Sequence, residues 1–265
     1  MIYVCSDIHG HLARYKKLIK KIHPSDTLYI LGDVIDRNPD GIEIIKDIMT
    51  RDNVILLCGN HEEFMLNHLS RQRLTSADNG KTDHIFENPS QIASSIWFAE
   101  NNGGQVTYDA FLRESEETQA KIFEYISNLP LIALLEVNGT KYHLSHAGTF
   151  SHDFNQYDLT KQPVFLGRQD MSPYSVNYVL WCCPYRYSDY LSSNSYPADF
   201  TCIIGHVPVQ IIRSRCRNYR PYVDDNLITI DGGCAFASVE ESTPDKVKTA
   251  LTCICLDTMK NIYIH

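Results

Sequence analysis

The sequence predicts an α/β fold built on a largely parallel sheet. Three short apolar runs, Ile2–Cys5, Thr27–Leu31 and Val54–Leu57, have the length and composition of buried strands. Between them, apolar residues recur at helical spacing from Leu12 to Ile22 and from Ile42 to Met49. The chain therefore begins β-α-β-α-β, an order typical of a parallel sheet covered by helices.

The character of the chain changes after the third strand. Residues from about 62 to 130 are polar, and we expect helices at Glu62–Leu69, Ser90–Glu100 and Glu116–Leu129 around a loose middle. A chain of 265 residues can bury a full core. We expect one domain spanning residues 1–265, in which residues 62–130 are a helical insertion that caps the site.

Strand-like sequence resumes after this insertion. Leu131–Val137 and Lys141–Ser145 are expected strands, and Asn138-Gly139 between them is a strong hairpin signal. Residues 150–198 are rich in Tyr, Ser and Pro, so we expect long loops around a short helix there. Further strands are expected at Thr201–Ile204, Leu227–Ile230, Ala250–Leu256 and Ile262–Ile264.

Composition and charge exclude several classes of protein. The net charge of −8 argues against nucleic acid as a partner, and the basic run from Arg14 to Lys21 is expected on a solvated helix face. No apolar stretch approaches the length of a membrane span, and Asp7 and His9 interrupt the first apolar run, unlike a signal peptide. The nine cysteines are scattered and form no Cys-x-x-Cys pair, so we expect buried reduced thiols in a cytoplasmic protein.

Side chains that bind metals follow the expected strands. In chain order they are Asp7, His9, Asp33, Asn60, His146 and His206. Because ligands of open α/β sheets bind in a crevice outside the carboxyl ends of the strands, we expect these side chains to converge there. His143 competes with His146, but it falls inside an expected strand, whereas His146 opens the following loop.

These residue types suit two divalent cations of hard or borderline character. One carboxylate has to bridge such a pair, and we expect Asp33 in that role. Two ions roughly 3.5–4 Å apart can hold a hydroxide and stabilise both the attacking and the leaving oxygen of a phosphoryl displacement. Mn²⁺ is the expected metal, and Fe, Zn²⁺ and Mg²⁺ accept the same kinds of ligand.

Neighbouring residues have the chemistry of catalysis and substrate binding. His61, next to the expected ligand Asn60, is placed to protonate a leaving oxygen as general acid. Asp36 would hold the His61 imidazole in one tautomer and raise its pKa. Arg37 offers a planar fork for two phosphate oxygens, and Asn60 is expected to contact substrate as well as metal.

At these residues the chain resembles the calcineurin-like metallophosphoesterases, and among them the bacterial phosphoprotein-phosphatase type. The five motifs of that group are present as Asp7–Gly10, Gly32–Arg37, Gly59–Glu62, His146–Gly148 and Gly205-His206. Weaker likenesses, such as Trp97 with Asn102-Gly103-Gly104 and Ile230–Cys234, extend the match over essentially the whole chain.

The resemblance implies a fold, a metal centre and residue roles. The fold is two packed mixed β-sheets flanked by helices, a four-layer sandwich with a dimetal centre along one edge. One ion would take Asp7, His9 and Asp33, and this division of the ligands rests mainly on the likeness. The second ion would take Asp33, Asn60, His146 and His206, beside the catalytic pair of His61 and Asp36 and the phosphate clamp Arg37.

Two positions depart from the family pattern. Protein phosphatases of this family usually have a second clamp arginine where this chain has Cys58, and a glycine where it has Asn38. Loss of one charge-assisted contact would cost about 1.5–3 kcal/mol of phosphate binding. Arg168 or Arg186 from later loops is a candidate replacement, and the sequence does not choose between them.

The expected activity is hydrolysis of a phosphate monoester by direct attack of metal-bound hydroxide, with a phosphorylated serine or threonine in a protein as the leading substrate. A dinucleoside polyphosphate, such as diadenosine tetraphosphate, is the alternative, because relatives with that activity also lack the arginine at the position of Cys58. A non-catalytic binding module of the same fold is the third hypothesis, and the intact Asp36, His61 and Arg37 argue against it.

Overall fold

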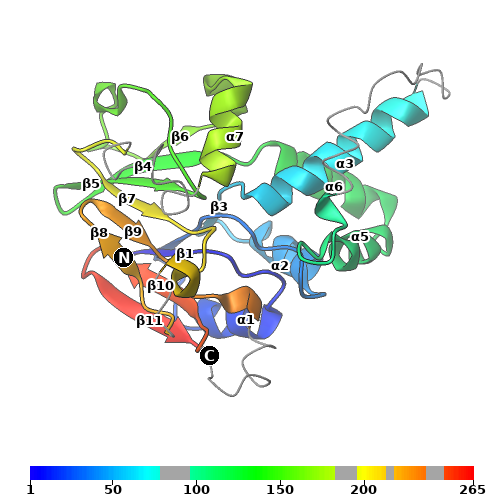
Figure 1. The fold of residues 1–265 in the computed structure, drawn as a ribbon, viewed down its shortest axis with the longest axis horizontal. Coiled ribbons are helices and arrows are strands. Elements are labelled where there is room, and N and C mark those ends of the chain that lie inside the picture. The colour runs from blue at the N-terminus through cyan, green and yellow to red at the C-terminus, as the bar shows by residue number, and fades with distance from the viewer. Residues whose placement is uncertain (78–95, 183–195, 213–217, 237–247) are drawn as a thin grey trace.

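The computed structural model describes residues 1–77, 96–182, 196–212, 218–236 and 248–265, and the side chains of residues 74–77 are excluded. It contains two mixed β-sheets flanked by helices, as the family resemblance implies (Figure 1). The first sheet has the strand order β11-β10-β1-β2-β3 and the second β6-β4-β5-β7-β9-β8. The mixed sheets implied by the resemblance are confirmed, whereas the largely parallel sheet expected from the opening β-α-β-α-β order is not found, because antiparallel strands flank the parallel ones in both sheets.

Each sheet contains three adjacent parallel strands. In the first sheet they are β1 (Ile2–Cys5), β2 (Thr27–Ile30) and β3 (Val54–Leu56), beside antiparallel β10 (Leu251–Cys255) and β11 (Lys260–Ile264). In the second they are β5 (Thr140–Ser145), β7 (Thr201–Ile204) and β9 (Leu227–Thr229), flanked by β4 (Ile132–Val137), β6 (Val164–Leu166) and β8 (Tyr222–Asp224). The site residues follow the carboxyl ends of these six parallel strands.

The two-residue period of the strands divides the core into two layers. Val4, Tyr29 and Leu31 of the first sheet pack with Leu144 and Ile203 of the second in the core between the sheets. The intervening residues Tyr3, Cys5, Leu28 and Ile30 face a second cluster that also contains residues of the helices. Strands buried on both faces read as unbroken apolar runs, which is why the sequence predicts them well.

Helices cover the outer faces. The elements are α1 (Leu12–Ile19), α2 (Gly41–Ile48), α3 (Asn60–Ala77), α5 (Gly104–Leu112), α6 (Glu116–Ser127), α7 (Pro173–Trp181) and α8 (Val209–Ile212). Short 3₁₀ turns lie at Phe154–Gln156, Arg168–Asp170 and Cys234–Phe236. Figure 1 shows α3, α5 and α6 together on one side of the two sheets.

Several expected elements are confirmed and others differ in extent. The Asn138-Gly139 hairpin joins β4 to β5, with both residues at positive φ (51° and 80°). The helix expected at Glu62–Leu69 begins at Asn60 and continues to Ala77, whereas most of the one expected at Ser90–Glu100 lies outside the described residues. That residues 1–265 form a single domain with residues 62–130 as a cap stays a prediction.

Helix α5, helix α8 and the strands β6 and β8 were not expected from the sequence. Residues 150–198 were expected to hold only loops around a short helix, but β6 adds an edge strand to β4 there. Strands β6 and β8 have three residues each and lie at the two edges of their sheet. A three-residue edge strand shows too little periodicity to be recognised locally.

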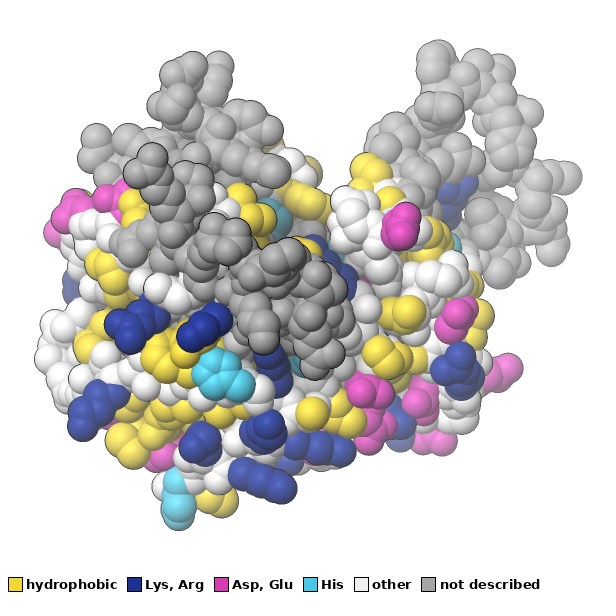
Figure 2. Space-filling model, turned by 60° about the horizontal axis from the view of Figure 1, so that its bottom comes forward, with side chains coloured by type: hydrophobic (Ala, Val, Ile, Leu, Met, Phe, Trp, Pro, Cys, Tyr) yellow, Lys and Arg dark blue, Asp and Glu magenta, His cyan; other side chains and the backbone are white. Residues whose placement is uncertain are grey.

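The surface and the cysteines agree with the composition. The exposed side chains of Lys16, Lys17, Lys20 and Lys21 form a solvated face at α1. The expectation is wrong for Arg14 of the same run, which is buried and donates to Thr249 Oγ1 at 3.2 Å. Figure 2 shows Lys and Arg side chains interspersed with hydrophobic ones on the view that brings this end of the molecule forward. The described cysteines are buried. Among the helices of the described residues, none is long and apolar enough to cross a membrane.

Candidate metal centre

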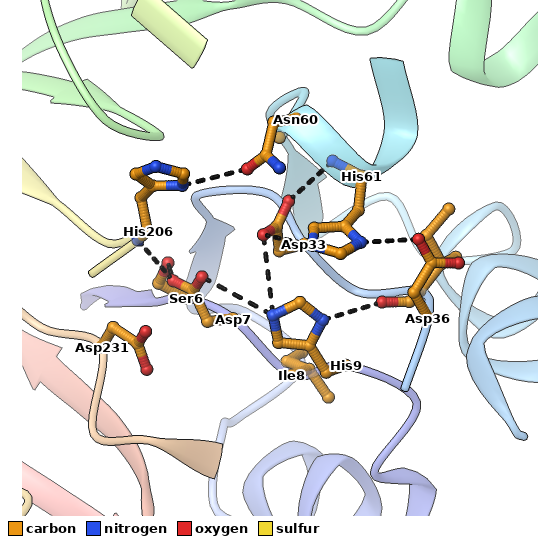
Figure 3. Close-up of polar contacts among 12 residues, drawn as sticks. Ser6, Asp7, Ile8, His9, Asp33, Asp36, Asn60, His61, His206 and Asp231 are labelled. Carbon is orange, nitrogen blue, oxygen red and sulfur yellow. Dashed lines mark hydrogen bonds and ion pairs between the residues drawn. The ribbon is translucent and has the colours of Figure 1, made fainter. Parts of the chain in front are cut away.

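Loops from both sheets bring the expected ligands into one buried cluster (Figure 3). Asp33 lies near its middle, with Oδ2 at 3.6 Å from His9 Nε2 and 3.5 Å from His146 Nε2. On the other side, Asn60 Oδ1 is 2.8 Å from His146 Nε2 and 3.0 Å from His206 Nδ1. Residues separated by up to 200 positions in the chain therefore surround one carboxylate.

Two groups of ligand atoms share the Asp33 carboxylate. One group joins Asp33 to His9 and His61, the other joins it to His146 and His206, and within each group the ligand atoms lie within 4.8 Å of one another. Asp7 borders the first group, because its Oδ1 is 3.9 Å from His9 Nε2. This arrangement suits two neighbouring cations that share Asp33.

The hydrogen bonding of the histidines shows why a cation fits. His9 Nδ1 faces the carbonyl of Ile35 at 3.0 Å and His146 Nδ1 faces that of Leu31 at 2.7 Å, so in each ring Nδ1 carries the proton. Burial, together with the positive charge of Arg37, lowers the pKa of His9 well below its usual value and keeps the ring neutral. Both Nε2 atoms thus direct lone pairs at the Asp33 carboxylate.

Acceptors therefore face acceptors in this cluster. Asp7 Oδ1 is buried and has no hydrogen-bond partner within the described part of the chain, and burial raises the pKa of Asp33 well above its usual value. Uncompensated buried acceptors are costly, and divalent cations are the partners that satisfy them. The donor set of carboxylate, amide and imidazole fits two such ions.

The backbone at the site is held in a sparsely populated conformation. Among the described residues nine non-glycine residues have positive φ, and six of them belong to the expected site: Asp7, His9, Asp33, Asp36, Arg37 and His206. Such residues persist only where their surroundings fix them. Two glycines allow the close packing that fixes these residues. A Cβ on Gly59 would overlap Asp33 Oδ1, and a Cβ on Gly205 would overlap Asp7 Oδ2.

Glu62 fixes the loop that carries Asp33. Its Oε2 accepts hydrogen bonds from the backbone N–H groups of Asp33 (2.8 Å) and Gly59 (2.9 Å), and its Oε1 accepts one from Val34 (2.9 Å). The carboxylate is fully buried in the first turn of α3, where the helix dipole also favours negative charge. Glu62 thereby links the second and third strand loops and sets the position of Asp33.

The pair His61 and Asp36 forms as expected. His61 Nδ1 lies 2.6 Å from Asp36 Oδ2, and both side chains are buried. Burial alone would lower the pKa of His61, but the charges of Asp33 and Asp36 outweigh it and raise this pKa. With Nδ1 bound to Asp36, the other ring nitrogen, Nε2, faces the cluster at 3.8 Å from Asp33 Oδ2.

Comparison with known proteins identifies the family. The family model described as calcineurin-like phosphoesterase matches residues 1–233, which include every residue of this cluster. The chain belongs to the calcineurin-like phosphoesterases.

Curated relatives of this phosphoesterase match over shorter stretches. The chain is 37% identical over 65 residues to the symmetrical bis(5′-nucleosyl)-tetraphosphatase of Buchnera aphidicola subsp. Schizaphis graminum, covering 23% of this chain and 24% of that protein. It is also 37% identical over 75 residues to a Caenorhabditis elegans protein assigned as a serine/threonine-protein phosphatase, covering 26% of this chain and 21% of that protein. The chain thus spans about a quarter or less of the length of the curated relatives it matches.

Two solved structures share the fold of this phosphoesterase over nearly the whole chain. A protein assigned as a diadenosine tetraphosphatase superimposes with a TM-score of 0.54 at 15% identity, covering 99% of this chain and 92% of that one. The cold-active protein-tyrosine phosphatase of a psychrophilic Shewanella gives 0.53 at 13% identity, covering 100% and 80%. At these identities the likeness is one of fold.

Of the two competing histidines, the structure brings His146 into the cluster. His143 lies in β5 with Nε2 at 3.1 Å from Thr149 Oγ1 and its ring centroid 5.1 Å from that of Phe154. Successive side chains of a strand point to opposite faces of the sheet. The His143 side chain points to the face of β5 that packs on Phe154. His146 follows the strand, in the loop.

The positions that depart from the family pattern have partners of their own. Asn38 replaces a glycine, and its side-chain amide donates to the carbonyl of His9 at 2.8 Å. At Cys58, the Arg168 guanidinium approaches Sγ to 3.1 Å and pairs with Glu63. Arg186, the other candidate replacement, lies outside the described residues.

An apolar pocket of about 890 Å³ adjoins the cluster. Phe64 and Trp181 form part of its wall with ring centroids 5.0 Å apart, and Arg168 lines it as well. The Phe64 ring lies edge-on to His61 and the Trp181 ring edge-on to His206, both at centroid distances of 6.0 Å. Two residues of the pocket wall therefore contact histidines on the two sides of Asp33.

Sequence reasoning missed the residues that support the ligands. They are Ser6, whose hydroxyl donates to Asp7, together with Glu62, Trp97, Thr107 and Asp231. Asp231 follows β9 and is buried beside Asp7 (Figure 3), where burial and the charge of Asp7 raise its pKa. The rule that polar residues follow parallel strands would have found Asp231. Trp97 belongs to a stretch that resembles the family pattern, but nothing in the sequence indicates its contact with Asp36, and no local signal marks Thr107.

Proposed function

We propose that this calcineurin-like phosphoesterase hydrolyses phosphate monoesters at a centre of two divalent cations, and that phosphoserine or phosphothreonine in a protein is its substrate. The observation that supports it most is the Asp33 carboxylate shared by two groups of lone-pair donors, directly beside the buried pair of His61 and Asp36. Two cations next to an oriented imidazole can together catalyse the transfer of a phosphoryl group to water.

The proposed ligands divide at Asp33. Asp7, His9 and Asp33 would hold one cation, and Asp33, Asn60, His146 and His206 the other. When bound, the cations would polarise the phosphoryl group and lower the pKa of water, with Mn²⁺ as the expected metal. The carbonyls of Ile35 and Leu31 keep the His9 and His146 rings in the tautomer that exposes Nε2.

Other side chains act on the substrate directly. His61 donates a proton from Nε2 to the leaving oxygen, while Asp36 holds Nδ1–H and prevents the ring from turning. Arg37 binds phosphate oxygens. Its Nε is buried and has no hydrogen-bond partner among the described residues, and its guanidinium lies 5.5 Å from the Phe236 ring centroid. Arg168 supplies the second cationic contact from beside Cys58, and Glu63 holds it there.

The pocket beside the cluster supports a peptide substrate. Its aromatic wall of Phe64 and Trp181 lies next to His61 and His206, so an apolar side chain flanking the phosphorylated residue would pack there. The net charge of −8 adds to this, because it disfavours a polyanionic substrate. The cytoplasmic location expected from the cysteines remains part of this proposal.

A dinucleoside polyphosphate is the second candidate substrate. It is favoured by the 37% identity to a symmetrical bis(5′-nucleosyl)-tetraphosphatase over 65 residues and by the cysteine at position 58. The same pocket would then stack a nucleobase on Trp181.

Product analysis separates the candidates. Purified protein with Mn²⁺ is given a phosphoserine peptide and, separately, diadenosine tetraphosphate, and released phosphate and nucleotides are quantified. The proposal predicts phosphate from the peptide at the higher kcat/KM. Release of nucleotide alone would replace it by the second candidate, and no product from either substrate or from an aryl phosphate would favour a non-catalytic binding module.

A further inference from the structure

We infer that Trp97 is a positioning residue for proton donation by His61, and that it acts through the Asp36 carboxylate. The inference rests on the proposed function, because it concerns the orientation of the proposed general acid. Trp97 is fully buried and comes from the stretch between β3 and β4, outside the strand loops that carry the expected ligands.

One oxygen of Asp36 receives two N–H groups. Asp36 Oδ2 lies 2.6 Å from His61 Nδ1 and 2.7 Å from Trp97 Nε1, and Asp36 itself is 0% exposed. The other oxygen, Oδ1, is buried and has no hydrogen-bond partner among the residues that the structure describes. The indole N–H is therefore the contact besides His61 that fixes the plane of this carboxylate, and a carboxylate fixed by two donors holds the imidazole in one orientation.

The same stretch holds the backbone on which Asp36 stands. Asp36 and Arg37 are consecutive residues with φ of 71° and 67°, a strained pair that needs external support. Asp36 N donates to Thr107 Oγ1 at 2.8 Å, and Arg37 N donates to the carbonyl of Gly103 at 3.3 Å. These two bonds fix the backbone, whereas the Trp97 bond fixes the side chain.

The indole is held independently of Asp36. Its ring centroid lies 4.9 Å from that of Phe98, 5.4 Å from His68 and 6.1 Å from Tyr108. Gly104 packs so closely that a Cβ there would lie 2.5 Å from Trp97 Nε1. A phenylalanine at position 97 keeps the aromatic surroundings and removes the N–H donor, so it isolates the contact in question.

The role predicts a dependence on the leaving group. A phenolate leaving group needs a proton more than a nitrophenolate, which is the better leaving group, so a misoriented general acid slows phenyl phosphate more than 4-nitrophenyl phosphate. General acid catalysis contributes about 10²–10⁴-fold to rate. Loss of orientation, as distinct from loss of the acid, is expected to remove roughly tenfold of this.

The test compares kcat and KM of the Mn²⁺-loaded protein for both phosphates. For Trp97→Phe we expect kcat for phenyl phosphate to fall roughly tenfold more than kcat for 4-nitrophenyl phosphate, with KM and bound manganese as in the parent protein. Phe98→Leu, which alters the same aromatic cluster without touching an N–H group, is the control and leaves the ratio of the two kcat values unchanged. In an Asp36→Asn background, Trp97→Phe changes this ratio no further.

Equal losses on the two phosphates, loss of manganese, or an effect that adds to that of Asp36→Asn would each overturn the inference. If Trp97→Phe does not fold, benzothienylalanine at position 97 makes the same test, because it replaces the N–H by sulfur and keeps the ring shape. A parent protein that hydrolyses neither phosphate would refute the proposed function itself, and this result is distinct from any outcome for the variant.

Discussion

The burial of His143 predicts how the free energy of unfolding depends on pH. Its side chain is fully buried in β5 and Nε2 contacts Thr149, while Nδ1 has no hydrogen-bond partner in the described residues. Burial disfavours the charged imidazolium and lowers the pKa of His143 from 6.5 to about 4. The perturbation is His143→Gln, which keeps a polar side chain of similar size and removes the titration.

The magnitude follows from the two pKa values. Below pH 6.5 the unfolded chain binds a proton at His143, whereas the folded chain does not until the pH approaches 4. Acid therefore shifts the equilibrium toward the unfolded state between these values. At pH 5 the difference amounts to roughly 1.5 pKa units, or about 2 kcal/mol at 1.36 kcal/mol per unit, and at pH 7.5 it is close to zero.

The assay is urea unfolding at pH 7.5 and pH 5.0, with EDTA present so that metal binding does not contribute. We expect the free energy of unfolding to fall between the two pH values by about 2 kcal/mol more in the parent protein than in His143→Gln. The matched control is His152→Gln, which makes the same substitution at an exposed histidine. If the free energy of unfolding depends on pH equally in the parent protein and in His143→Gln, the conclusion that the buried His143 ring is neutral is wrong.

Three further predictions concern the centre. His61→Asn lowers turnover by roughly 10²–10⁴-fold because it removes the proton donor, while the manganese content measured by elemental analysis is unchanged. Loss of manganese in this variant would show that His61 is a metal ligand, which its place near His9 and Asp33 allows. Asp33→Asn weakens binding of both ions, since both groups share this carboxylate, and metal titration that shows only one weakened site would contradict that. Arg168→Met raises KM for a phosphorylated substrate by roughly tenfold or more, the equivalent of a charge-assisted contact of about 1.5–3 kcal/mol; an unchanged KM would exclude Arg168 as a phosphate contact.

The sequence by itself determined most of the sheets and the residue types of the site. Strands such as Thr27–Ile30 are buried on both faces and are therefore continuous apolar runs in the sequence. Such a run can be recognised without knowing which strands pair with it. Asp7, Asp33, Asn60 and His206 could be named because each follows such a run, and parallel strands place their carboxyl ends at a shared edge.

Tertiary structure alone decided how these residues are held. The sequence already favours His146 over His143 by its place after the strand, but only the structure shows that its ring reaches Asp33 and that the carbonyl of Leu31, 115 positions away, orients it. The three hydrogen bonds of Glu62 and the indole of Trp97 on Asp36 join segments with no shared periodicity. Contacts of this kind depend on packing between distant elements, and hydrophobic pattern and local spacing contain no information about them.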